Sequence, residues 1–232
     1  MTAPSELRLF RTLVAWDFLR EMRRRTTLLS MGVMGVITLF LFSFAIRPED
    51  AVLANTRAGI LWVTFLLAAT IGIDRAFRND AESGVLEGLL LAPVGRATLY
   101  YARVTSTFLF VASLQALLLV LFLLLFNQEI PRATLAPMLA IVAATSLGFV
   151  AVGVLISAMT WSLPAGDVLL RILLFPMLLP VFNVAVEATD KAFAGRAPSW
   201  LHVGMICAFD LLFLGAGHLL FEHLVKDSGG RT

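Results

Sequence analysis

The sequence predicts an all-α membrane protein with six transmembrane helices, and three observations lead to that fold class. Of its 232 residues, 59% are hydrophobic and 15% are charged, whereas a soluble domain averages about 25% charged residues. The mean hydropathy is +0.88. The charges are distributed so that six apolar runs approach the roughly 20 residues that cross about 30 Å of hydrocarbon. One water-soluble core could not bury this much apolar surface.

The six expected spans follow one another as a single transmembrane domain over 1–232, without a repeat or a linker. Pro137 and Pro164 mark the turns that flank the fourth span. Arg171 interrupts the fifth span near its start, and Asp210 lies inside the sixth. The spans are expected at about 28–46, 58–73, 104–126, 138–159, 168–186 and 200–221.

The distribution of Lys and Arg predicts the orientation of the chain. With both termini in the cytoplasm, 13 of the 18 Lys and Arg residues lie inside and 5 lie outside, as the positive-inside rule requires. The stretch between the second and third spans, 74–103, is then cytoplasmic. The first span is preceded by 27 residues and exceeds the apolar core of a signal peptide, so we expect it to be retained.

Residues 5–25 are predicted to form a helix that lies at the membrane interface. Apolar residues recur there at helical spacing, although Arg11 interrupts the face. The Arg residues could meet anionic lipid headgroups, or they could serve only as a topogenic signal. The apolar positions are Leu7, Phe10, Val14, Phe18 and Met22.

A polar and then amphipathic segment, 74–96, separates the second and third spans. Gly84 breaks the run, 85–91 is apolar except for Glu87, and Pro93 ends it, because proline disfavours helical geometry at the preceding residue. This pattern predicts a short helix along the membrane surface with Glu87 toward water, suited to docking a soluble partner. The alternative is an ordinary cytoplasmic loop.

The same segment carries the pattern R-x-F-R-x-D-x-x-x-G-x-L-E-x-L-x-L-x-P. Its positions are Arg75, Phe77, Arg78, Asp80, Gly84, Leu86, Glu87, Leu89, Leu91 and Pro93. The pattern resembles the heme exporter protein B family, the permease subunit of the cytochrome c maturation ABC transporter. Two local matches add to it: 59–63, which includes Trp62, resembles the family's second span, and Pro176-x-x-x-Pro180 resembles its fifth.

The resemblance implies an ABC-2-type permease in the bacterial cytoplasmic (inner) membrane. The segment 74–96 would be the coupling helix that enters a cleft on an ABC ATP-binding subunit, and the N-terminal helix would lie against that subunit. Two copies of the permease and heme-handling membrane proteins of cytochrome c maturation are implied. The sequence contains no G-x-x-x-x-G-K-[ST] phosphate loop, so we expect no catalytic residue, and ATP bound by the partner.

Several residues within the spans are candidates for a role in transport. Asp210 is ionisable at mid-span, which is costly and often functional, although we favour a hydrogen-bonded or protonated interior group without a role in transport. Pro176 and Pro180 free backbone carbonyls. Gln115 is expected to join helices by hydrogen bonds. A row of small residues on the fourth span permits close helix contact, within the chain or between copies: Ala140, Ala144, Gly148, Gly153 and Ser157.

Heme is the possible substrate, and no cofactor or metal is expected to be bound by this chain. His202, near the outer end of the sixth span, is the one histidine placed to meet heme on the outer side, although an isolated interfacial histidine is more often only interfacial. The heme-binding residues are otherwise unknown, and the connection to heme rests on the resemblance.

Three classes of function compete. The first is the heme-pathway permease, which would export heme or use ATP to release a heme-loaded chaperone. The second is an ABC-2-type permease for another amphiphile, such as a lipid, glycan or drug. The third, an intramembrane enzyme, is disfavoured because the sequence has no paired Asp and no H-E-x-x-H. An ion channel is disfavoured because the spans carry no rings of polar residues and no filter-like loop. No nucleic-acid partner is expected.

Overall fold

The computed structural model describes residues 6–23, 25–46, 51–82, 95–160 and 166–228, and all regular structure in these ranges is helical. The six spans differ in the share of their residues that other helices bury. The helices are α1 (Glu6–Arg23), α2 (Arg25–Ala45), α3 (Ala51–Glu82), α5 (Arg96–Leu125), α6 (Arg132–Thr160), α7 (Gly166–Phe193) and α8 (Trp200–Ser228).

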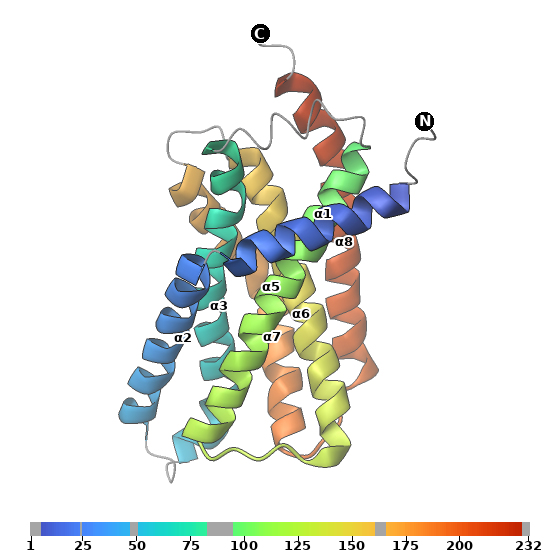
Figure 1. Cartoon of the computed structure of the whole chain (residues 1–232). Coiled ribbons are helices and arrows are strands. Elements are labelled where there is room, and N and C mark those ends of the chain that lie inside the picture. Colours follow the sequence, from blue (N-terminus) through green and yellow to red (C-terminus); the bar gives the residue numbers. More distant parts are fainter. Residues whose placement is uncertain (1–5, 24, 47–50, 83–94, 161–165, 229–232) are drawn as a thin grey trace.

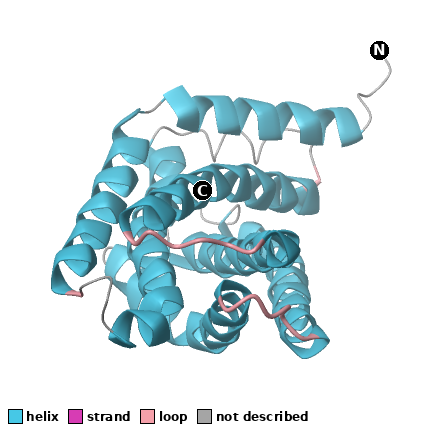
Figure 2. Ribbon diagram, turned by 90° about the horizontal axis from the view of Figure 1, so that it is seen from below, coloured by secondary structure: helices cyan, strands magenta, loops and turns pink. Residues whose placement is uncertain are grey.

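Within the described ranges, six helices are long and apolar enough to cross a membrane: α2, α3, α5, α6, α7 and α8. This confirms the predicted fold class. Figure 1 shows these six running roughly side by side, while α1 crosses the bundle at one end. Seen from below in Figure 2, α1 lies along one side of the bundle and not among the spans. A helix is thus present where one was expected over 5–25, and its position at a membrane interface stays a prediction.

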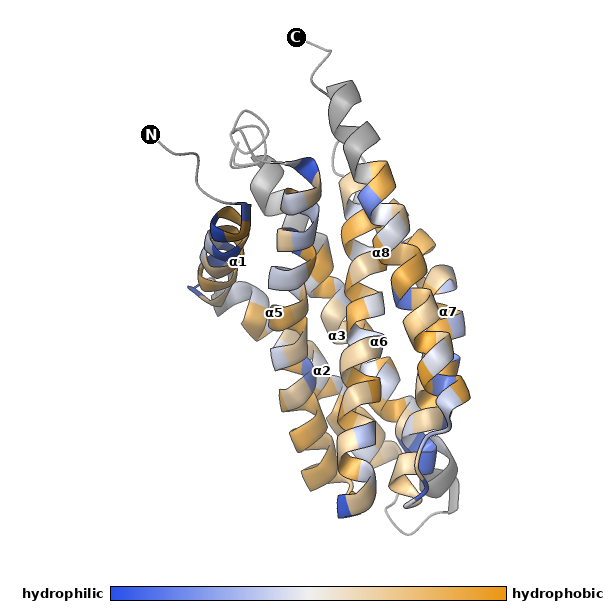
Figure 3. Cartoon of the chain, turned by 90° about the vertical axis from the view of Figure 1, so that its right-hand side faces the viewer, coloured by the Kyte–Doolittle hydropathy of each residue, from blue (hydrophilic) through white to orange (hydrophobic). Residues whose placement is uncertain are grey.

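Helix α6 is the centre of the bundle. In its most apolar window 72% of residues are buried, compared with 22% for α2 and 17% for α8. It contacts α3, α5, α7 and α8. In Figure 3 hydrophobic residues cover most of the length of the spans, and hydrophilic residues gather on α1 and near the helix ends. The outer helices thus present apolar side chains to lipid.

The core of α3 and α7 is aromatic. Trp62 packs edge-on against Phe65 and Phe182, with ring centroids 5.7 and 5.3 Å away. Phe149 of α6 lies 5.2 Å from Phe65. The indole Nε1 of Trp62 donates a hydrogen bond to Thr189 Oγ1 at 3.1 Å. Burying the ring with its one polar atom satisfied fixes α3 against α7.

The helices extend beyond the apolar runs that predicted them. Helix α3 continues past Ile73 to Glu82, because charged side chains outside the hydrocarbon do not break a helix. Its 32 residues make a rod of about 48 Å, compared with about 30 Å of hydrocarbon. Likewise α5 begins at Arg96, earlier than the expected 104. Both helices therefore continue beyond the predicted apolar runs at the end of the bundle where α1 lies (Figure 1).

The assignment of Pro137 to a turn was wrong. Pro137 lies inside α6, which begins at Arg132. Proline removes one backbone hydrogen bond and crowds the preceding turn, and near the start of a helix this affects a single carbonyl. Pro164 lies outside the described residues. Pro176 and Pro180 lie inside α7.

Candidate functional site

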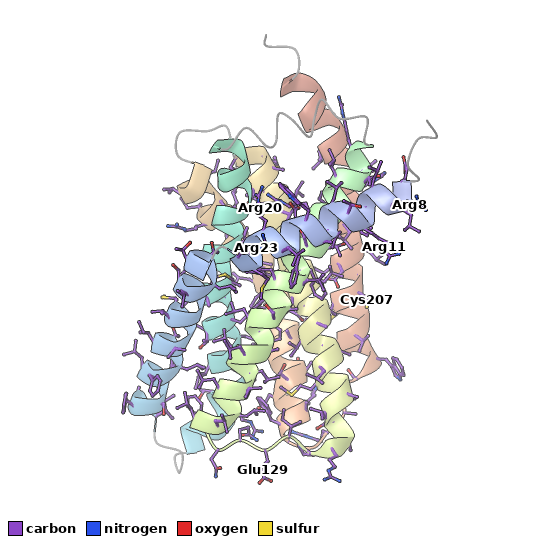
Figure 4. All side chains as sticks on the ribbon, in the orientation of Figure 1. Arg8, Arg11, Arg20, Arg23, Glu129 and Cys207 are labelled. Carbon is purple, nitrogen blue, oxygen red and sulfur yellow. The ribbon has the colours of Figure 1, made fainter. Side chains whose placement is uncertain are left out.

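The candidate site is the end of the bundle that carries α1, the last turns of α3 and the first turns of α5, which we name the α1 end. The opposite end, named the far end, carries the connection between α5 and α6, where Glu129 is labelled in Figure 4. The residues that flank 83–94, Glu82 and Gly95, both belong to the α1 end (Figure 1). The predicted coupling segment therefore connects at the same end as the interfacial helix.

An ion pair joins α1 to α5. Arg103 Nη1 donates to Asp17 Oδ2 at 3.1 Å, and the two side chains are only 14% and 13% exposed. Ser106 Oγ lies 3.4 Å from the same carboxylate oxygen. A buried carboxylate requires such partners. The pair fixes both the height and the rotation of α1 on α5.

Beside this ion pair lies a cavity of about 20 Å³, large enough for about one water molecule. Residues of α1, α3 and α5 line it. A Cβ at Gly72 would lie 2.6 Å from Met31 Cε, so the glycine lets α2 approach α3 here. Four helices therefore meet at this point. The cavity is lined by Asp17, Arg20, Gly72, Arg103, Ser106, Thr107 and Phe110.

The face of α1 turned toward the bundle differs in part from the predicted apolar face. Phe10, Val14 and Phe18 are partly buried, but Leu7 and Met22 are 68% and 41% exposed. Asp17 lies on the inward side because Arg103 pairs with it. Spacing alone did not identify this charged residue on the packed face.

The surface of α1 outside its packed face is rich in Arg and carries an exposed Trp. Figure 4 shows Arg8, Arg11, Arg20 and Arg23 along the helix. Arg8, Arg11 and Arg23 are exposed, whereas Arg20 lines the cavity beside Asp17. The guanidinium carbon of Arg20 lies 4.8 Å from the ring centre of Trp16, which is 46% exposed. Exposed Trp together with Arg is typical of a helix at a membrane interface.

Part of the coupling motif falls within the described helices. Arg75, Phe77, Arg78 and Asp80 lie in the last turns of α3. The remaining positions lie outside the described residues. These are Gly84, Leu86, Glu87, Leu89, Leu91 and Pro93.

Asp210 lies in α8 against the small-residue row of α6. Its side chain is 6% exposed, and its Oδ1 has no hydrogen-bond partner among the described residues. A Cβ at Gly148 would collide with that oxygen. A Cβ at Gly153 would collide with Ile73 of α3. Both glycines therefore serve contacts within the chain, and Ala140 is exposed.

The expectation that Gln115 joins helices by hydrogen bonds was wrong. The residue is 1% exposed, and neither its amide nitrogen nor its oxygen has a partner in the described part of the chain. Hydropathy places a polar residue at mid-span, but it does not tell which side chains of the neighbouring helices face that residue. Trp62, by contrast, is a core residue with a bonded indole. Pro176 and Pro180 both lie on exposed positions of α7.

His202 lies in a polar cluster at the far end. Its Nδ1 is within hydrogen-bond distance of Ser199 Oγ, and its Nε2 lies 3.2 Å from Lys191 Nζ and 3.3 Å from Glu187 Oε1. Both ring nitrogens thus have neighbours, and the ring is 6% exposed. An axial heme ligand needs a free nitrogen that faces the porphyrin, so this arrangement does not favour His202 as a ligand.

A second far-end contact connects α3 and α7 to the connection after α5. Arg57 Nε lies 3.3 Å from Asp190 Oδ1, and Arg57 Nη1 donates to Gln128 Oε1 at 3.2 Å. The guanidinium also lies 5.3 Å from the ring centre of Phe193. Among the described residues, no three His, Cys, Asp or Glu side chains are grouped to hold a metal ion.

Comparison with known proteins places this arrangement in a family. The CcmB protein family matches residues 8–225, which include α1 and all six spans. The chain belongs to the CcmB protein family. The match extends over both ends of the bundle and through the 83–94 segment.

Several curated relatives carry the name heme exporter protein B. The protein of Pseudomonas aeruginosa PAO1 is 31% identical over 208 residues, which cover 88% of this chain and 91% of that protein. The protein of Escherichia coli K12 is 32% identical over 158 residues, or 68% of this chain and 70% of that protein. The protein of Bradyrhizobium diazoefficiens is 29% identical over 190 residues, or 81% and 84%. The chain is thus a CcmB-family permease subunit and a multi-pass membrane protein.

Sequence reasoning missed the polar contacts that hold both ends of this CcmB-family chain. Asp17 and Arg103 are 86 residues apart, and Arg57 and Asp190 are 133 apart. A signal existed only for Glu187 and Lys191, which stand four residues apart on one helix. The other pairs depend on which helices are neighbours, and a single sequence does not provide that information.

Proposed function

We propose that this chain is the membrane subunit of an ABC transporter of the heme pathway, driven by a separate ATP-binding subunit. One observation carries the proposal: helix α1 and the segment predicted to dock an ATP-binding subunit lie at the same end of the bundle. Helix α1 is held to α5 there by the ion pair of Asp17 with Arg103. Helix α3 ends at Glu82, and the rest of the segment follows it. The name heme exporter protein B, carried by the relatives, supports heme as the substrate.

In this proposal the segment 74–96 is the coupling helix, and α1 forms the second part of the docking surface. Closure of two ATP-binding subunits would displace one segment in each of two copies. Helices α3 and α5 continue directly from the segment, so the displacement would pass into the bundle. The ion pair of Asp17 with Arg103 would make α1 move together with α5.

The orientation that fits this proposal has both termini in the cytoplasm of a bacterial cell, with the chain in the cytoplasmic membrane. The excess of Lys and Arg on the α1 side supports it. Membrane proteins that handle heme in cytochrome c maturation would be further partners on the outer side.

Two mechanisms fit the same subunit. In the first, the complex exports heme; in the second, it uses ATP to release a heme-loaded chaperone. The dense packing of α6, with Gly148 and Gly153 closed by neighbouring side chains, favours the second, because this bundle passes movement through contacts. The engagement of both His202 nitrogens supports the same choice. A permease for another amphiphile remains the alternative.

The test is purification of the tagged chain from its native membrane in mild detergent, followed by mass spectrometry of the proteins that accompany it. We expect an ABC ATP-binding subunit together with heme-handling membrane proteins. Lipid or glycan machinery in their place would establish the alternative permease. Absence of any ATP-binding subunit, under conditions that preserve known complexes, would overturn the proposal.

Variants of the segment 74–96 then test whether it couples the chain to the partner's ATPase. Glu87→Lys and Gly84→Pro should abolish stimulation of the partner's ATPase while membrane insertion is kept. Glu129→Lys is the matched control, since Glu129 is an exposed carboxylate at the far end (Figure 4). Wild-type coupling in both segment variants would refute the docking assignment, as would an equal loss in the control.

A further inference from the structure

An apolar groove of about 500 Å³ runs between α2 and α5, beneath the last turn of α1. Helix α2 forms one wall, α5 forms the other, and Met22 of α1 lies at its upper end. The wall side chains are largely open, since Leu29, Val33 and Leu117 are 62%, 53% and 57% exposed. Leu114, which is 2% exposed, also lines it.

The groove arises because the two sides of α2 have different roles. On one side Gly35 meets Leu118 of α5, where a Cβ would lie 2.5 Å away from its Cδ2. On the other side a Cβ at Gly32 would meet nothing within 4 Å. Helix α2 therefore touches α5 along one line and stands away from it beside that line.

The length of the groove fits one leaflet. From Leu28 to Ile37 the wall of α2 covers nine residue steps, or about 14 Å, which is roughly half of the 30 Å hydrocarbon core. Ser113 is a polar residue of the lining, and its hydroxyl is already bonded to the carbonyl of Phe110. The lining thus accepts a hydrocarbon chain and offers no polar partner for a headgroup.

The chain is basic where it passes from α1 to α2, next to the upper end of the groove. Positions 23 to 25 are all Arg. Arg23, which is exposed, ends α1 one residue after Met22 and lies beside the start of α2 (Figure 4). Arginine forks suit phosphate oxygens, and a basic cluster at the headgroup level attracts anionic lipids.

From this placement we infer that the groove is a binding site for an anionic phospholipid, with one acyl chain along α2 and the phosphate at the Arg rim of α1. Charge complementarity at the rim selects this occupant over a zwitterionic lipid. The site would also attach the C-terminal part of α1 to the membrane. The inference stands apart from the proposed transport function, because it needs only insertion of the chain in a bilayer.

The test is native mass spectrometry of the purified full chain, titrated with phosphatidylglycerol or phosphatidylcholine of identical acyl chains. The wild-type chain should retain phosphatidylglycerol at a roughly fivefold lower concentration, since Arg23 at the rim attracts an anionic headgroup. Gly32→Leu should fill the groove and lower that retention about tenfold. Gly215→Leu is the matched control, since a Cβ there also meets open space, on α8.

Two more variants separate the parts of the site. Val33→Trp offers a second way to fill the groove, and the unfolding midpoint of each variant shows that it is folded. Arg23→Gln should weaken phosphatidylglycerol without changing phosphatidylcholine, whereas Arg132→Gln, an exposed arginine at the far end, should change neither.

Four results would overturn the inference. Unchanged retention of phosphatidylglycerol in both filled variants would show that the lipid binds elsewhere. Equal retention of the two lipids by the wild-type chain would show that the site does not prefer an anionic headgroup. Loss of a dimer mass in the filled variants, with lipid retention intact, would make the groove a contact between copies. Retention of added heme that depends on Gly32, without retention of phosphatidylglycerol, would make it a substrate slot.

Discussion

At the far end of the bundle, the described charged contacts join one span to another, whereas at the α1 end a buried ion pair joins a span to α1, which crosses the end of the bundle (Figure 1). Arg57 connects α3 to α7, and His202 connects α8 to α7. At the α1 end, Arg103 of α5 holds Asp17 of α1. The far-end contacts oppose separation of the spans, and the α1 contact makes an external helix move with a span.

The degree of burial differs in the same direction. The side chains of Asp17 and Arg103 are 13% and 14% exposed, while Asp190 and Glu187 are 40% and 62% exposed. A buried ion pair is costly to break, because the partner that remains is left without solvent. An exposed pair contributes little. The α1 contact should therefore be the more sensitive of the two to substitution.

The largest expected effect comes from breaking the α1 contact. Asp17→Ala leaves Arg103 buried without this carboxylate, and the free energy of unfolding should fall by about 3 kcal/mol. Unfolding in mixed micelles, titrated with a denaturing detergent, would measure it. Exchange of the charges, Asp17→Arg with Arg103→Asp, should restore part of the loss; no recovery would mean that the pairing contributes little.

A smaller effect is expected in the middle of the bundle. Gly148→Ala would press a methyl group on Asp210 and Phe209; overpacking costs about 2 kcal/mol and the better helix propensity of Ala returns about 1. The net loss should be about 1 kcal/mol by the same titration. Gly204→Ala, which meets open space on α8, should be neutral or stabilising. Equal results for both would refute the close approach of α6 to α8.

The far-end pair sharpens the comparison with Asp17. Asp190→Ala removes a carboxylate that is 40% exposed, so its cost should stay near 0.5 kcal/mol. Arg57 keeps its bond to Gln128 and its contact with Phe193. If Asp190→Ala destabilised the chain as much as Asp17→Ala, the proposed difference between the two ends would be wrong.

The smallest effect is expected for Glu187→Gln. The carboxylate is largely exposed, and its pair with Lys191 is a surface pair within one helix. The unfolding midpoint should not change measurably, and His202 keeps Ser199 and Lys191 as neighbours. A clear loss of stability would show that the far-end cluster is desolvated in the membrane.

The sequence predicted the six spans and the interfacial helix because each depends on composition along one stretch of chain. It underestimated the helix lengths, because α3 continues through charged residues to Glu82, where hydropathy no longer indicates structure. It also missed Asp17 with Arg103 and assigned hydrogen bonds to Gln115 that are absent from the described contacts. These depend on helix rotation and on which helices are neighbours.

The site predictions also differ according to whether they depend on one stretch of chain or on which helices are neighbours. The motif from Arg75 to Pro93 was found from residue types and spacing, and family membership supports it. Its docking role stays a prediction. The groove beside Gly32 had no signal in the sequence, because an apolar stripe on α2 has the same composition whether α5 covers it or lipid does.

One consequence of α3 concerns leverage. This helix is a continuous rod from the far-end contact of Arg57 to Glu82, where the proposed docking segment continues. If the far-end contact acts as a fulcrum, a tilt of the rod displaces Glu82 further than any point within the membrane. A large stroke at the docking surface would then become a small, forceful shift among the buried aromatic residues around Trp62.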